Sequence, residues 1–60
     1  MSVDIDRVFG MFEINGLKIK RVEVLDDDKG IIVWAFGKNS SAFIKDNKGI
    51  LEAISYIKKH

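Results

Sequence analysis

The sequence predicts an α+β domain in which a four-stranded antiparallel β-meander is followed by one C-terminal α-helix packed on one face of the sheet. Three observations predict it. The dipeptide Asn15-Gly16 is typical of two-residue hairpin turns, because both residues tolerate positive φ. Residues 31–36 form an unbroken apolar run, and residues 49–59 carry apolar side chains at helical spacing. We expect residues 1–60 to form one ββββα domain, because the length leaves no room for a second.

The first two strands follow from the Asn15-Gly16 turn. Folding the chain there pairs apolar residues on one face and sets Glu13 opposite Lys18 on the other. The apolar positions then change parity between Ile19 and Val22. A one-residue β-bulge near Lys20-Arg21 would restore the pattern, so we expect one there.

The next two strands are shorter and differ in burial. Residues 31–36, Ile-Ile-Val-Trp-Ala-Phe, are apolar on both faces, which is typical of a central strand covered on both sides. Residues 41–45 are expected to form the fourth strand. In the helix at residues 49–59, Ile50, Ile54 and Ile57 follow an i, i+4, i+7 pattern, so one face is expected to pack on the sheet.

The N-terminal segment has a second interpretation. Its apolar residues also fit one helical face: Ile5, Val8, Phe9 and Phe12. Ser2 or Asp4 would cap such a helix, and Asn15-Gly16 would end it. Gly10 in its middle would cost about 1 kcal/mol relative to alanine. We prefer the hairpin because its pairing accounts for more residues.

The composition excludes several classes of function. Apolar residues make up 47% and charged residues 32% of the chain, so it is globular rather than disordered. Ten Lys and Arg balance nine Asp and Glu, which implies no general attraction to nucleic acid or acidic membranes. The longest apolar run is too short to span a bilayer, and the N-terminus lacks a signal-peptide pattern. With no cysteine, the chain is expected in the cytoplasm.

No group of residues predicts catalysis, a metal site or a cofactor. The single histidine, His60, is the last residue, and no serine lies in a nucleophile-elbow pattern. The acidic run Asp26, Asp27 and Asp28 does not match the spacing of a calcium loop. We interpret it as a solvated turn that could dock a basic partner surface. The protein is therefore predicted not to be an enzyme.

The predicted fold has more apolar surface than one helix can cover. The face away from the helix would carry Phe9, Met11, Trp34 and Phe36. Bare apolar patches of this kind mark interfaces, and a chain this short forms only a small core. We therefore expect a small binding or regulatory protein that forms a homodimer, or docks on a protein partner, through this face or a strand edge.

The alternative is single-stranded nucleic-acid binding. Lys18, Lys20 and Arg21 fall together along the second predicted strand, and aromatic residues lie nearby. Binders of single strands combine such basic rows with aromatic rings on which bases stack. The near-neutral charge and the acidic turn make this the second choice.

Overall fold

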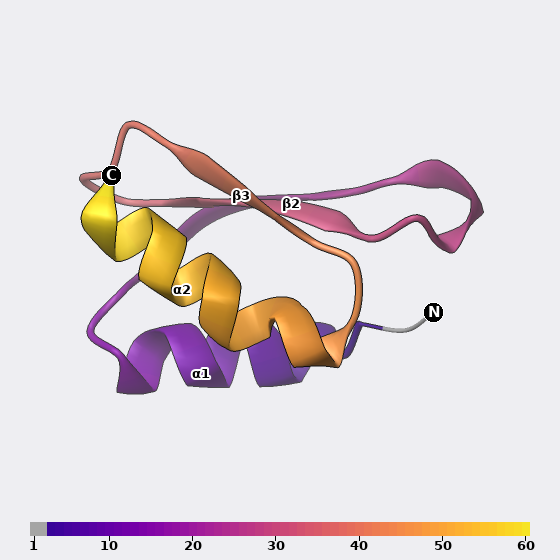
Figure 1. The fold of residues 1–60 in the computed structure, drawn as a ribbon, viewed down its shortest axis with the longest axis horizontal. Helices are drawn as coiled ribbons and strands as arrows, with labels where there is room; N and C mark the ends of the chain where they lie inside the picture. Colours follow the sequence, from indigo (N-terminus) through magenta and orange to yellow (C-terminus); the bar gives the residue numbers. More distant parts are fainter. Residues whose placement is uncertain (1–2) are drawn as a thin grey trace.

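The structure, a computed structural model, describes residues 3–60. Two helices and three strands follow one another in the order helix, three strands, helix: α1 (Ile5–Ile14), β1 (Ile19–Val24), β2 (Ile31–Ala35), β3 (Ser41–Ile44) and α2 (Ile50–Lys59). The strands form one antiparallel sheet in the order β1-β2-β3. Both described helices lie on the same side of this sheet, so neither of them covers its other side (Figure 1).

The predicted four-stranded ββββα fold is wrong, because the segment expected as the first strand is α1. Local capping favours the helix. The Asp4 carboxylate accepts a hydrogen bond from the Arg7 backbone N–H at 3.3 Å, as an N-cap residue does. At the other end the Asn15 side-chain amide donates to the Met11 carbonyl at 2.8 Å, and Gly16 takes a φ of +79°. Asn15-Gly16 thus ends a helix instead of forming a hairpin turn.

Burial explains why the helix prevails over the hairpin. In α1, Val8 and Phe12 point into the core and are completely buried. Each buried side chain of this size contributes about 1.5–3 kcal/mol. A Cβ at Gly10 would meet nothing within 4 Å, so its cost stays near the ~1 kcal/mol of an exposed helical glycine. Burial therefore exceeds the glycine penalty.

The predicted bulge near Lys20-Arg21 is confirmed, although its partner strand differs. Ile19 pairs with Ala35 and Arg21 with Trp34, so Lys20 is the extra residue of β1. The bulge interrupts the pairing of β1 with β2, whereas the hairpin prediction placed it in a pairing with the N-terminal segment. It returns Val22 to the side of Ile19, and both side chains pack against the core.

The core lies between the inner face of the sheet and the two helices. Alternate residues of β2 and β3 supply the sheet's part of it: Ile31, Val33, Ala35, Ala42 and Ile44, each at most 6% exposed. The predicted C-terminal helix is confirmed, with Ile50, Ile54 and Ile57 buried. The predicted central position of residues 31–36 is also confirmed for β2, but coverage of both its faces is wrong, because Ile32 and Trp34 remain partly exposed.

Gly30 lies just before β2 and allows the backbone there to pass close to the end of β3. Its φ of +123° is a conformation that residues with a side chain rarely adopt. A Cβ there would come within 2.5 Å of the Ile44 carbonyl oxygen and 3.0 Å of the Lys45 Cα. Only glycine therefore allows the two backbones to approach this closely.

Candidate functional site

The side of the sheet that no helix covers is the candidate functional site. Its residues come from β1, β2, β3 and the segments beside them, and we call this surface the outer sheet face: Lys18, Arg21, Ile32, Trp34, Phe36 and Phe43. Phe36 and Phe43 are more than half exposed, at 54% and 55%. Four large apolar side chains thus share one surface with two cations.

Strand register brings Arg21 and Trp34 together in the middle of this face. They are direct partners across β1 and β2, and the Arg21 guanidinium lies 4.8 Å from the centre of the Trp34 ring. The same guanidinium donates to the Glu23 carboxylate at 3.2 Å. A cation over an aromatic ring adds about 0.5–1 kcal/mol at an exposed site. Arg21 therefore contacts both Trp34 and Glu23 on the outer sheet face.

Lys18 and Phe36 form a second such pair at one end of the face. The Phe36 backbone N–H donates to the Lys18 carbonyl at 2.9 Å, which extends the pairing of β1 and β2 beyond the strand ends. The Lys18 ammonium lies 5.8 Å from the centre of the Phe36 ring. Two cation–aromatic pairs consequently lie along the same pair of strands.

Phe43 and Ile32 also belong to this face, and the sequence interpretation missed both. They pair directly across β2 and β3. The signal was present: in residues 41–44, the small or aliphatic residues Ala42 and Ile44 alternate with Ser41 and Phe43. That alternation assigns Phe43 to the side opposite the core.

The four residues predicted as interface anchors lie in two different regions of the fold. Trp34 and Phe36 lie on the outer sheet face, whereas Phe9 and Met11 belong to α1 on the other side of the sheet. Phe9 is 47% exposed and lines a small depression together with Lys18. Met11 is partly buried against the core. The prediction that all four share one sheet face is therefore wrong, because residues 5–14 are helical.

The remaining predicted residues lie further along β1 and in the turn that follows it. Lys20 is exposed at the bulge. Asp26, Asp27 and Asp28 lie in the irregular turn between β1 and β2, and that hairpin end projects beyond the helices (Figure 1). Asp27 and Asp28 have φ values of +58° and +55°, which aspartate tolerates better than most residues. The acidic turn is thus at one end of the sheet.

The described part of the chain has neither a cluster of metal ligands nor a membrane-spanning helix. Among residues 3–60, no three His, Cys, Asp or Glu side chains lie close enough together to hold a metal ion. Within the same residues, no helix has the length and apolar character needed to cross a membrane.

Comparison with known proteins adds no relative. No protein-family model, curated protein sequence or solved structure matches this chain. A function for this chain is therefore inferred from the outer sheet face and the other surfaces of the fold.

Proposed function

We propose that this chain is a small, non-catalytic binding protein that regulates or inhibits another macromolecule by contact through its outer sheet face. One observation carries the proposal: Ile32, Trp34, Phe36 and Phe43 lie together on a side of the sheet that neither helix covers. An apolar cluster left exposed in this way is typical of an interaction surface.

The composition of the face also supports contact with a protein. Trp34 lies partly buried at the centre, and aromatic and arginine side chains dominate the energetic centres of protein interfaces. Lys18 and Glu23 lie at the border, where polar residues form the rim of an interface. Because Arg21 is already held by Trp34 and Glu23, little side-chain entropy would be lost when a partner binds.

Single-stranded nucleic acid is the second candidate ligand, and one observation favours it. The cations Lys18 and Arg21 lie over the rings of Phe36 and Trp34, so phosphate-binding and base-stacking groups share one surface. The Glu23 carboxylate beside Arg21 and a formal net charge of only +1 oppose it. Protein contact therefore remains the first proposal.

Affinity capture with matched variants tests the first proposal. Immobilised wild-type protein is compared with Phe36→Ser/Phe43→Ser and with Ile14→Ser, which removes an apolar side chain that is 86% exposed on α1. We expect one or more proteins from the source cells to be retained by wild type and Ile14→Ser but lost by the double variant. Equal retention by all three would contradict the use of the outer sheet face.

Titration with fluorescent oligonucleotides tests the second candidate. Binding that weakens steeply between low and moderate salt, and that Arg21→Ala reduces, would favour nucleic acid, because phosphate contacts release counterions. Lys58→Ala is the control, since it removes a charge from the end of α2. Failure to bind any oligonucleotide at low salt would eliminate this candidate.

A further inference from the structure

The two edges of the sheet are built differently. The β1 edge carries a bulge at Lys20, and Lys20, Arg21 and Glu23 place charges along it. Bulges and charges are the devices by which proteins prevent another strand from pairing with an edge. The β3 edge has neither: residues 41–44 are uncharged, and their register with β2 is regular. Because β3 is last in the sheet order, its outer backbone groups have no neighbouring strand among residues 3–60.

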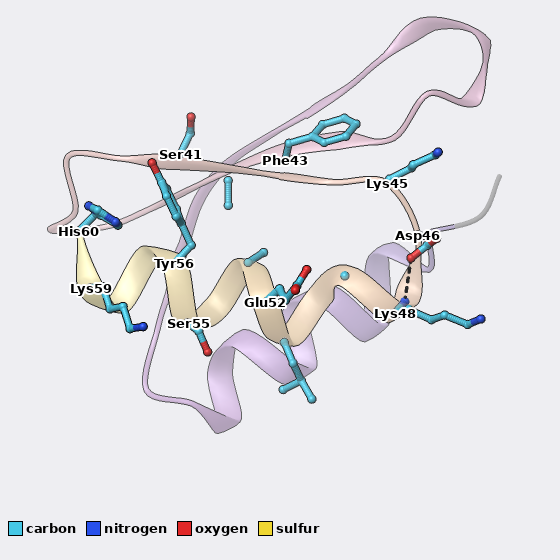
Figure 2. Close-up of a pocket in the computed structure, with 14 residues that line it drawn as sticks. Ser41, Phe43, Lys45, Asp46, Lys48, Glu52, Ser55, Tyr56, Lys59 and His60 are labelled. Atoms are coloured by element: carbon cyan, nitrogen blue, oxygen red, sulfur yellow. Dashed lines mark hydrogen bonds between the residues drawn. The ribbon is translucent and has the colours of Figure 1, made fainter.

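An open groove runs between this unguarded edge and α2. Leu51 and Tyr56 of α2 line it and are 59% and 47% exposed. Figure 2 shows Tyr56 rising from α2 toward Ser41 of β3, and the Tyr56 ring lies 4.4 Å from that of His60. A strand added beside β3 would therefore meet apolar side chains as well as unpaired backbone groups.

The face of α2 that lines the groove carries one acidic and one basic side chain, one on each side of Ser55. Its residues recur at helical spacing on one face of α2: Leu51, Glu52, Ser55, Tyr56 and Lys59. Ser55 is small and lies near the middle, with the acidic Glu52 on one side and the basic Lys59 on the other. Two such helices crossing antiparallel at Ser55 would place each Glu52 beside a Lys59.

We propose that a second copy of this chain occupies the groove across a two-fold axis, with β3 pairing antiparallel to β3 and α2 crossing α2 at Ser55. The contact is self-complementary, as a two-fold interface must be. In Figure 2, Ser55 lies below Ser41 and Glu52 lies below Phe43, so this face of α2 runs along the same side of the groove as β3. Leu51 and Tyr56 of each copy become covered.

Electrostatics favours a second copy over an unrelated strand. The two Glu52–Lys59 contacts fix the antiparallel direction, and charge pairs of this kind set register more than affinity. A formal net charge of +1 gives little repulsion between copies. The dimer would join two sheets edge to edge and bring two outer sheet faces side by side. It stands independently of the proposed function, which needs only one such face.

Sedimentation equilibrium with charge-swapped variants tests this dimer. We expect wild type to approach twice 6.8 kDa at high micromolar concentration. Ser55→Lys places a bulky charge at the helix crossing, and we expect it to weaken association by about tenfold or more, since burying an unpaired charge is costly. Glu52→Lys should also weaken association, and Glu52→Lys/Lys59→Glu should restore it. Glu13→Lys on α1 makes the same charge change elsewhere and should have no effect.

Circular dichroism checks the folding of each variant, and we expect every variant to be folded because Glu52, Ser55 and Lys59 are exposed. Amide exchange gives a second readout: alternate amides of β3 should exchange more slowly as concentration rises, while those of β1 should not change. A monomer at all concentrations would overturn the proposal and leave the groove to an extended segment of another protein. A dimer that resists Ser55→Lys but dissociates in Phe36→Ser/Phe43→Ser would also overturn it.

Discussion

The two faces of the sheet are made by neighbouring residues of the same strands, yet they have opposite surroundings. On the inner face, Ile31 and Ile44 are fully buried against the helices. On the outer face, Ile32 and Phe43 pair with each other and lie beside solvent. The comparison shows that apolar character alone does not identify the core of a small domain. Coverage by α1 and α2 decides which face is core and which is available for contact.

The largest expected effect is a difference in the free energy of unfolding between substitutions at two adjacent positions of β2, one on each face of the sheet. Ile31→Ala should lower the free energy of unfolding by about 2–5 kcal/mol, because it leaves a cavity among buried side chains. Ile32→Ala should cost less than about 1.5 kcal/mol, since its side chain is already partly solvated. Urea denaturation measures both. Equal losses would mean that the outer face is as tightly packed as the inner one.

A second prediction concerns the backbone junction that holds the inner face together. Gly30→Ala should cost about 2 kcal/mol or more, because the new Cβ would meet the Ile44 carbonyl oxygen in addition to the strained φ. Gly37→Ala is the matched control: its φ of +75° is similarly unfavourable, but a Cβ there meets nothing within 4 Å. It should cost only about 1 kcal/mol. Thermal melting of the two variants compares them directly, and the reverse order would contradict the close approach.

A smaller effect is expected from the helix that covers the inner face. Asp4→Ala should destabilise the protein by about 1 kcal/mol, because the Arg7 backbone N–H loses its capping carboxylate. Asp4→Asn is the control and should retain most of the stability, since asparagine caps nearly as well. Chemical denaturation of both tests the cap. No difference between alanine and asparagine would show that Asp4 does not stabilise the start of α1.

The smallest effect on stability is expected at Phe36, on the outer sheet face, where the proposed function requires a large effect on binding. Phe36→Ser should lower the free energy of unfolding by less than about 1 kcal/mol, because the side chain is more than half exposed and loses only its pairing with Lys18. Partner capture by the outer sheet face should nevertheless decrease. The paired measurements are urea denaturation and the capture assay. A large loss of stability would instead assign Phe36 to the core.

The second half of the fold could be predicted from the sequence. The N-terminal segment could not, because it was expected to be a strand and is the helix α1. The stripe of Ile50, Ile54 and Ile57 predicted α2, and the change of parity after Ile19 predicted the bulge, because both signals are local. Asn15-Gly16 favours a hairpin turn and a helix end alike, since each needs a residue that tolerates positive φ. What distinguishes them is the burial of Val8 and Phe12 under the sheet, and that depends on contacts far along the chain.

The candidate site was predictable only where it did not depend on α1. Trp34 and Phe36 were identified from the apolar run of residues 31–36, and Lys18 and Arg21 from the basic segment before it. The pairing of cations with rings required the register of β1 and β2, which places Arg21 opposite Trp34. The hairpin prediction places Phe9 on the same face, and the helical conformation of residues 5–14 removes it from there.

Trp34 is the only tryptophan of the chain, and it lies beneath an arginine rather than inside the core. Its indole emission is therefore a built-in optical reporter of whether this surface is occupied. Quenching or a blue shift on adding a ligand would signal occupancy without any attached dye, and the midpoint of that change would give the affinity directly.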